Sequence, residues 1–431
     1  MKHVVFVDST VSGLLAFQAS KRLGHYTTFI LPKDASFLSI SVNGDRSKFE
    51  PALKFVDKFV EVDSLNGDEF RSVLQELDRE RRIDALLTTS EAAIVPVARE
   101  AERLGTIYPS HDALCGAVHK DRLRQCLRDA KVRSPDFQVM DEADLAAGKQ
   151  PRIPLPFVVK PTRGFAKQFS AICFTQEQYR EFTKQVEETR RSTNLMIDQL
   201  VSRTYLIEQY IKGTLHSAEV IVQDGKVQCY ATTIRFRSVY SELLEMTATM
   251  PSGLDVGARQ EIKDYVQSVF TALNLRSGLY HVELLRDEEG PCLVEINARM
   301  MGSVAPQMYR MLTDIDPFEM LVKLHLGETI SIDDSLLTSA ASVVTVASRY
   351  GGRISESYKR EDLDLLLKRF NIDFCTVDVS PGQSVNVYTG NIGTIGHVIV
   401  KGSDPYTAAR KGNDFLRELD SLFGFELAKY F

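Results

Sequence analysis

Short apolar runs alternate with helix-like stretches over the first hundred residues of the chain. Leu14–Leu23 and residues 91–104 place apolar side chains at the spacing of an α-helix. Four largely apolar runs have the character of buried parallel strands. They are His3–Asp8, Thr27–Leu31, Phe59–Val62 and Ala85–Thr88. This alternation predicts a small doubly wound α/β domain over residues 1–110.

The rest of the chain mixes strands and helices in a different order. Helices are predicted over residues 119–130, 177–190, 257–273 and 316–326. Strands are predicted over residues 157–160, 171–174, 279–285 and 291–297, with three more between residues 205 and 230. These elements predict an α+β region over residues 111–333 and a small β-rich cap over residues 334–431.

Composition and charge narrow the class of protein. The length of 431 residues suits two or three domains. The net charge of -6 is spread along the chain, which argues against a nucleic-acid partner or an anionic membrane. The six cysteines are scattered singly, so we expect neither a zinc site nor a disulfide framework. No signal sequence or membrane-length apolar run is seen, so we expect a cytoplasmic protein.

The strands 279–285 and 291–297 flank a predicted hairpin turn and carry acidic side chains. Because side chains alternate between faces, Glu295, Asn297 and Arg299 share one face of their strand. Folding the hairpin about residues 288–289 places Glu283 roughly opposite Glu295. Two such carboxylates repel unless a cation lies between them, and oxygen ligands of this kind suit Mg²⁺. The alternative is two half-exposed acids on a solvated strand face.

Two upstream segments offer groups for a nucleotide. Lys160 ends the apolar strand PLPFVVK, where its ammonium could reach a phosphate, although a surface lysine with a buried stem is the alternative. Residues 205–211 form a strand whose backbone could bind an adenine edge, with Glu208 accepting from the adenine amino group. A plain strand is the alternative for this segment.

Taken together, these features resemble the ATP-grasp superfamily, and within it the carboxylate–amine ligases of the L-amino-acid ligase (dipeptide synthetase) type. The most specific part of the likeness is Glu283, then Glu295 twelve residues later, then Asn297 and Arg299. The likeness covers nearly the whole chain. It implies an ATP-grasp fold with an N-terminal pre-ATP-grasp domain, a mobile lid lobe over about residues 135–205 and a C-terminal cap.

The resemblance implies a set of ATP-binding residues. Lys120 matches a lysine that opens the ATP domain, and Lys160 matches the lysine of the VVKP strand that contacts phosphates. The segment from Glu208 through Tyr210 to Ile211 matches the lobe-linking segment that holds adenine. His216 falls where some relatives contact the ribose.

The segment TRGFAKQFS departs from the family pattern. Relatives carry a phosphate loop rich in Gly and Ser here, whereas this chain has the single glycine Gly164. Backbone amides would still cradle the phosphates. We expect the charge of Lys167, or of Arg163, to replace part of what the missing glycines provide.

The resemblance also implies metal and substrate residues. Glu283, Glu295 and Asn297 match the ligands of Mg²⁺, for which Mn²⁺ is a possible substitute. Glu245 matches a glutamate that contacts the amino group of the first substrate, but Ala248 stands where relatives often have histidine. The substrate-binding residues implied by the likeness are Glu245, Arg299, Gly302 and Ser303.

The expected reaction is ATP-dependent joining of a carboxylate to the amine of an amino acid through an acyl phosphate. Lys160 and Arg299 would stabilise the transferring group. Two alternatives stay open at this point. One is an ATP-grasp ligase or carboxylase that acts on a different acid, and the other is a nucleotide-binding regulator without catalysis. Neither the acid nor the amine follows from the sequence, and the likeness leaves a homodimer open.

Overall fold

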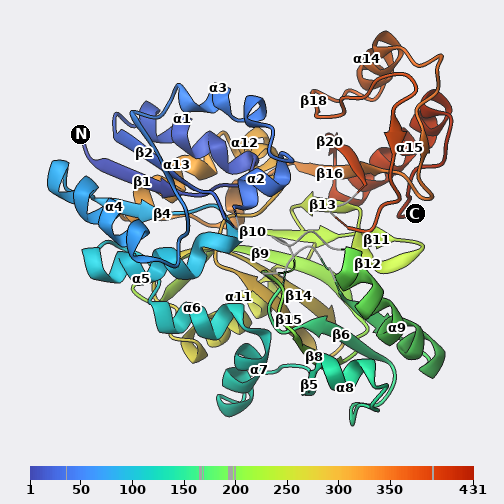
Figure 1. Cartoon of the computed structure of the whole chain (residues 1–431). Coiled ribbons are helices and arrows are strands. Elements are labelled where there is room, and N and C mark those ends of the chain that lie inside the picture. The colour runs from blue at the N-terminus through green and yellow to red at the C-terminus, as the bar shows by residue number, and fades with distance from the viewer. Residues whose placement is uncertain (35, 165–166, 168, 193–197, 199, 391–392) are drawn as a thin grey trace.

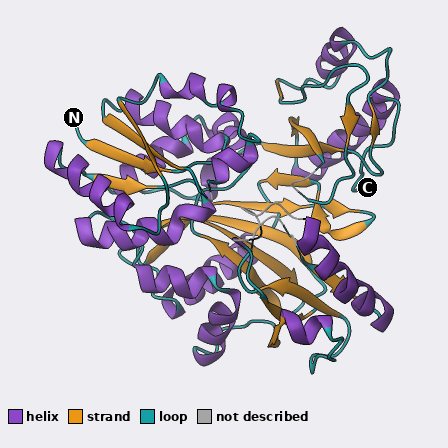
Figure 2. Cartoon of the chain, in the orientation of Figure 1, coloured by secondary structure: helices purple, strands orange, loops and turns teal. Residues whose placement is uncertain are grey.

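The computed structural model describes residues 1–431 except positions 35, 165–166, 168, 193–197, 199 and 391–392. Within this part of the chain the strands form one eight-stranded sheet, two four-stranded sheets and two short ribbons. Figure 1 shows the N-terminal domain, the small sheet of the lid lobe and the C-terminal segment arranged around the large central sheet. Helices cover the outside of each sheet (Figure 2).

The N-terminal domain is a parallel sheet in the order β3-β2-β1-β4. Its strands are β1 (His3–Val7), β2 (Tyr26–Pro32), β3 (Lys58–Val62) and β4 (Ala85–Leu87). Its helices are α1 (Leu15–Arg22), α2 (Phe37–Ser41), α3 (Glu50–Leu53), α4 (Asp68–Glu80) and α5 (Ile94–Leu104). Every residue of β1 is buried, because helices cover both faces of a parallel sheet. The prediction of a doubly wound α/β domain is confirmed.

The large sheet is antiparallel, in the order β15-β14-β9-β10-β13-β16-β20-β18. Its strands are β9 (Thr214–Gln223), β10 (Lys226–Arg235), β13 (Thr247–Met250), β14 (Gly278–Asp287), β15 (Gly290–Asn297), β16 (Ala340–Ala347), β18 (Phe374–Cys375) and β20 (Thr394–Gly402). Helices α6 (His111–Val118), α7 (Lys120–Asp129) and α11 (Val256–Ala272) share a core with its β9, β14 and β15 end. This packing leaves the opposite face of the hairpin β14–β15 free to line a site.

The small sheet is also antiparallel, in the order β5-β8-β6-β7. Its elements are β5 (Phe137–Asp141), α8 (Glu142–Ala146), β6 (Phe157–Pro161), β7 (Ala171–Cys173), α9 (Gln176–Ser192) and β8 (Thr204–Gln209). Tyr205 and Ile207 on β8 belong to the core that this sheet shares with α8 and α9. Strand alternation therefore turns Leu206 and Glu208 to the other face. The domain boundaries and the mobility of this lobe stay predictions.

The C-terminal segment contains the expected strands and also two helices that the sequence did not predict. These are α14 (Arg360–Arg369) and α15 (Pro405–Phe423), with the ribbon strands β17 (Gly352–Arg353) and β19 (Ser384–Val385). Helix α15 packs Ala409, Phe415 and Leu419 into a core with β16 and β20. The cap is thus built onto an extension of the large sheet. Among the described residues no helix has the length and apolar content that crossing a membrane requires.

Two helices after the hairpin join the N-terminal domain to the large sheet. They are α12 (Ala305–Thr313), which was not predicted, and α13 (Pro317–His325). Phe17, Met308 and Leu321 lie in one continuous core. Arg22 on α1 forms ion pairs with Asp316 and Glu319 at the start of α13, with 3.0 Å between Arg22 Nε and Glu319 Oε1. The N-terminal domain is therefore held against the central sheet by both apolar and charged contacts.

Arg124 on α7 connects three elements from inside the protein. Its side chain is completely buried, and its Nε donates to Glu208 Oε1 on β8 at 2.6 Å. Its Nη2 donates to the carbonyl oxygen of Val294 on β15 at 2.9 Å. Because a buried charge is tolerated only when it is paired and hydrogen-bonded, these contacts fix how the small sheet meets the hairpin.

We expect Arg124→Met to lower the free energy of unfolding by about 3 kcal/mol, because it leaves the buried carboxylate of Glu208 with one cation fewer. Arg122→Met, on the exposed side of the same helix, is the matched control and should change stability by less than about 0.5 kcal/mol. Urea unfolding followed by circular dichroism measures the difference in a chain without tryptophan. Equal unfolding midpoints for the two variants would contradict the assigned role of Arg124.

Candidate active site

A cavity of about 920 Å³ lies where the N-terminal domain, the small sheet and the large sheet meet. Ser12 and Glu91 line it from the N-terminal domain, and Lys160 lines it from the small sheet. Glu283 and His397 line it from opposite ends of the large sheet. The three parts of the fold therefore contribute to one site.

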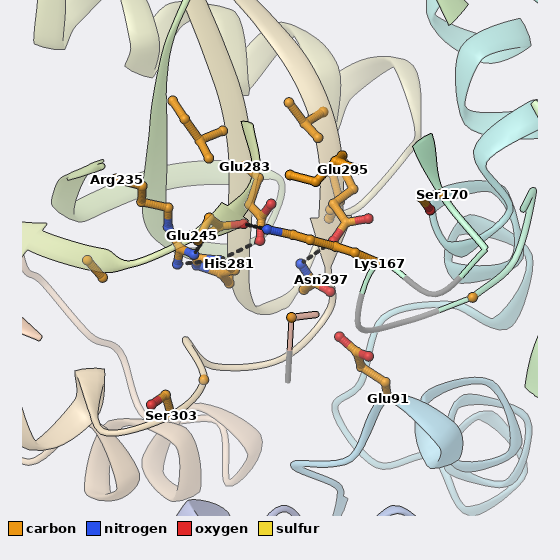
Figure 3. Close-up of a pocket in the computed structure, with 18 of the residues that line it drawn as sticks. Glu91, Lys167, Ser170, Arg235, Glu245, His281, Glu283, Glu295, Asn297 and Ser303 are labelled. Carbon is orange, nitrogen blue, oxygen red and sulfur yellow. Dashed lines mark hydrogen bonds and ion pairs between the residues drawn. The ribbon is translucent and has the colours of Figure 1, made fainter. Parts of the chain in front are cut away.

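The hairpin β14–β15 brings two acids together at this cavity. Glu283 is paired directly with Glu295, and the next pair on the same face of the ladder is His281 with Asn297. Figure 3 shows Glu283, Glu295 and Asn297 on one side of the two strands, with the Asn297 Nδ2 donating to Glu295 Oε1 at 3.4 Å. The prediction that the two carboxylates lie roughly opposite each other is confirmed, and their direct pairing depends on a register shift between Glu283 and Leu284 that leaves Val294 as the extra residue.

Cations keep the carboxylate of Glu295 charged. The Lys120 Nζ lies 3.3 Å from Glu295 Oε2. Burial alone would raise the pKa of Glu295, but the positive charges of Lys120 and Lys160 outweigh it and lower the pKa to about 2. The carboxylate is therefore ionised at neutral pH and already attracts one cation.

The donor set fits a hard divalent cation that shares its ligands with a nucleotide. Among the described residues no group of three or more His, Cys, Asp or Glu side chains is arranged to hold a metal unaided. Glu283, Glu295 and the amide oxygen of Asn297 offer only oxygen donors. Mg²⁺ is usually held by one or two carboxylates and completes its shell with phosphate oxygens and water. Their assignment as metal ligands stays a prediction.

Lys160 reaches the cavity from the tip of β6, but its partner changes the expected role of Glu208. The Lys160 Nζ lies 2.7 Å from Glu208 Oε2, while Arg124 holds the other oxygen. Burial would raise the pKa of Glu208, but Arg124 and Lys160 outweigh it and lower the pKa. Both oxygens thus have cationic partners, so the idea that this carboxylate accepts from the adenine amino group is not supported. Instead Glu208 positions Lys160.

A second cluster of charges lies beside the hairpin around Glu245, the last residue of β12 (Ser241–Glu245). Its carboxylate forms ion pairs with both Lys167 and Arg235. Burial would raise the pKa of Glu245, but these two cations outweigh it and lower the pKa. The ammonium of Lys167 is therefore directed to Glu245, as Figure 3 shows, and its expected role as a phosphate contact stays a prediction. Residues 165, 166 and 168 of the same loop lie outside the described residues.

His281 connects the two clusters. Its Nδ1 lies 2.7 Å from the buried Glu219 Oε1, and its Nε2 lies 3.2 Å from Glu283 Oε1 and 3.0 Å from the Arg235 Nη2. Burial would lower the pKa of His281, but the charge of Glu219 and hydrogen bonds to Glu219 and Glu283 raise it to about 9. At neutral pH the ring is thus protonated and donates to both carboxylates. This arrangement orients Glu283.

Arg299 faces the cavity from the loop that follows β15. Its Nε donates to Glu91 Oε1 at 3.1 Å, so the N-terminal domain contributes the acid that holds this arginine. Its Nη1 donates to the carbonyl oxygen of Met300 at 2.9 Å. Gly302 and Ser303 line the same cavity just beyond it. The structure therefore brings the predicted substrate residues to one region.

The remaining predicted residues divide into two groups. Tyr210 and Ile211 line the cavity, and the Tyr210 hydroxyl donates to Glu242. His216 does not line it. This ring is buried between Thr214 and the carbonyl oxygen of Thr233, and burial lowers its pKa to about 4. The expected ribose contact of His216 is therefore not supported, because alternation along β9 turns His216 away while Leu215 faces the cavity.

Sequence reasoning missed several residues of the site. Glu91, Arg124, Arg235 and Glu219 were not singled out. One available signal was Glu219, an acid inside the apolar strand LHSAEVIV, because a buried acid implies a partner. Arg235 similarly ends an apolar strand, as Lys160 does. Glu91 and Arg124 carry no comparable signal, since their partners are distant in the chain.

Comparison with known proteins identifies the domains and the fold. Residues 17–106 match the ATP-grasp N-terminal domain, and residues 153–307 match the ATP-grasp domain. Over 294 residues the chain is 24% identical to an uncharacterized protein, y4rH, of Sinorhizobium fredii, covering 67% of this chain and 59% of that protein. Over 271 residues it is 25% identical to alanine–anticapsin ligase of Bacillus subtilis, covering 59% of this chain and 56% of that protein.

A solved structure shares the fold over the full length of this chain. The L-amino acid ligase from Bacillus licheniformis superposes with a TM-score of 0.78 and 20% identity, covering 100% of this chain and 99% of that one. At this identity the likeness shows the fold. The chain spans less than two thirds of the length of the two curated relatives. From the two domain matches, which together cover more than half of the chain, and from this fold, the chain belongs to the ATP-grasp superfamily.

Proposed function

We propose that this protein is an ATP- and Mg²⁺-dependent ligase that activates a carboxylate as an acyl phosphate and joins it to the amine of an amino acid. The observation that carries the proposal is the register of Glu283 with Glu295, in the cavity that Lys160 and Arg299 also line. The similarity to an alanine–anticapsin ligase and an L-amino acid ligase supports the same class of reaction.

The nucleotide would lie between the small sheet and the hairpin. Residues 209–211 line this part of the cavity. The N–H groups of Gln209 and Tyr210 donate to the carbonyl oxygens of Asp136 and Pro156, so the N–H of Ile211 is the donor that we assign to an adenine edge. Lys120 and Lys160 would contact phosphate oxygens. Lys160 keeps a direct hydrogen bond to Glu208, so its ammonium is held in place before the nucleotide arrives.

The metal end would be formed by Glu283, Glu295 and Asn297. When bound there, Mg²⁺ neutralises charge on the phosphates and so makes the γ-phosphorus accessible to an anionic nucleophile. His281 holds Glu283 by donating to it, and Lys120 holds Glu295. These contacts fix both carboxylates in one orientation.

The substrates would bind towards Glu245 and Arg299. A carboxylate oxygen of the acid attacks the γ-phosphorus, the bond to the β–γ bridging oxygen breaks, and ADP leaves. The amine nitrogen then attacks the acyl carbon, phosphate departs with the activated oxygen, and the nitrogen loses a proton. Arg299 is placed to stabilise negative charge on the acid, and Glu245 to bind an ammonium once Lys167 releases it.

Glu295→Ala should reduce kcat/KM for ADP release about 100-fold or more, because it removes one of the two carboxylates that we propose to hold Mg²⁺ at the phosphates. Glu288→Ala, in the exposed turn of the same hairpin, is the control and should keep the activity. Circular dichroism melting confirms that both variants fold. Full turnover by folded Glu295→Ala would refute the magnesium assignment.

ADP release measured over a matrix of amino acids and amines tests the reaction class. We expect a low rate with ATP alone and a several-fold higher rate when a matching acid and amine are both present. The amine consumes the acyl phosphate and so frees the enzyme for another turnover. Stimulation by bicarbonate or by a non-amino-acid acid alone would indicate another ATP-grasp reaction. No stimulation by any pair would indicate a nucleotide-binding regulator.

A further inference from the structure

One wall of the cavity is made by strands far from the hairpin. In the large sheet, Ala248 on β13 is paired with Val343 on β16, and Thr345 on β16 is paired with His397 on β20. Phe374 on β18 pairs with Ile399, two residues beyond His397, and therefore lies on the same face. The residues of this wall that line the cavity are Ala248, Val343, Thr345, Phe374, Thr376 and His397. We call them the C-terminal wall.

The C-terminal wall begins beside Glu245. That residue precedes β13 by two positions, and the backbone N–H of Thr345 donates to the carbonyl oxygen of Met246 at 2.8 Å. The Tyr388 hydroxyl, which also lines the cavity, donates to the carbonyl oxygen of Glu245 at 2.8 Å. A molecule whose amino group binds Glu245 would therefore direct its adjacent side chain along this wall.

The chemistry of the wall differs from that of the rest of the cavity. Lys, Arg, Asp and Glu surround the hairpin and Glu245, whereas the described residues of the C-terminal wall include none of them. Burial lowers the pKa of His397 to about 4, so its ring is neutral at physiological pH. A charged side chain would find no counter-ion here and would lose its hydration.

His397 gives this wall a polar side chain that has no hydrogen-bonding partner among the described residues. Its backbone is fixed by Thr376, whose N–H donates to the His397 carbonyl oxygen at 2.8 Å and whose hydroxyl accepts from the His397 N–H at 2.9 Å. Its ring nitrogens, in contrast, make no hydrogen bond to any described residue, and neither does the hydroxyl of Thr345. A neutral imidazole has one hydrogen-bond donor and one acceptor. A bound ligand that covers these two groups without pairing with them loses binding free energy.

We propose that the C-terminal wall receives the side chain of an amino-acid substrate, and that this side chain is uncharged and carries a hydroxyl or amide that hydrogen-bonds to His397. The inference rests on the proposed function and names the substrate class of that site. Ala248, Val343 and Phe374 contact the apolar part of the side chain. His397 selects its polar end, because a site built around a hydrogen-bonding group disfavours an analogue that lacks the matching group.

Calorimetric binding of matched amino acids tests the wall without requiring turnover. The probes are L-threonine against L-valine and L-asparagine against L-leucine, with Mg²⁺ and a non-hydrolysable ATP analogue present. Each pair has a similar shape and differs in its polar end. The wild-type protein should bind the polar member of at least one pair about tenfold more tightly, as one or two neutral hydrogen bonds allow.

Three variants separate selection by His397 from a structural effect. His397→Leu should abolish the preference or reverse it, His397→Asn should retain most of it, and His25→Leu, a histidine that does not line the cavity, should leave it unchanged. Melting followed by circular dichroism checks that each variant folds. The ratio of affinities within a pair is unaffected by a uniform loss of folded protein.

The outcomes distinguish this inference from the proposed function. Equal affinities within both pairs, a preference that survives in His397→Leu, or binding of none of the four amino acids would overturn the role of the wall. ADP release is recorded on the same samples. Selective binding that depends on His397 but drives no ADP release with any amine would support the wall and contradict the ligase activity.

Discussion

Two carboxylates face each other across the β14–β15 hairpin, and cationic side chains lie close to both of them. Directly opposed strand positions lie only about 5 Å apart between Cβ atoms, so Glu283 and Glu295 repel strongly in a partly buried site. Lys120 lies against Glu295, and protonated His281 donates to Glu283. The rest of the cavity is arranged around this requirement for positive charge.

The fold meets that requirement by bringing three separate layers together. Helix α7 supplies Lys120, the small sheet supplies Lys160, and the large sheet supplies Arg235. The buried pair of Arg124 and Glu208 fixes the small sheet against the hairpin, so Lys160 is positioned by the same contact that joins two layers. Stability and site geometry thus depend on shared interactions, which is common where charged groups are buried.

The charges also divide the cavity into regions. Around the hairpin, carboxylates and ammonium groups alternate and suit a metal and phosphates. At Glu245, Lys167 occupies the position that we propose for a substrate ammonium, so a substrate that binds there would compete with the Lys167 ammonium. Beyond Glu245 the charged residues end, and the C-terminal wall presents apolar groups and neutral His397. On this proposal a substrate is recognised by charge at one end and by hydrogen bonding at the other.

The sequence predicted the parts of the site that local geometry decides. Folding the hairpin from its turn predicted that Glu283 and Glu295 lie roughly opposite each other. The two-residue turn alone would pair Glu283 with Val294, however, and a register shift between Glu283 and Leu284 makes the pairing with Glu295 direct. The sequence does not show which face of a longer strand a given side chain takes. His216 on β9 was expected to contact the ribose, but it points away from the cavity. Partners distant in sequence, such as Glu91 for Arg299, depend on how whole layers pack. Helix α15 was missed because its amphipathic pattern lies in a segment rich in turn residues.

The central claim is that the hairpin is the metal end of an ATP site. A crystal structure of the protein with ADP and Mn²⁺, with anomalous scattering used to locate the manganese, tests this claim directly. The account predicts an anomalous peak between the carboxylates of Glu283 and Glu295, at about 2 Å from their oxygens and in contact with the diphosphate. Bound ADP with its manganese away from both carboxylates would contradict the account.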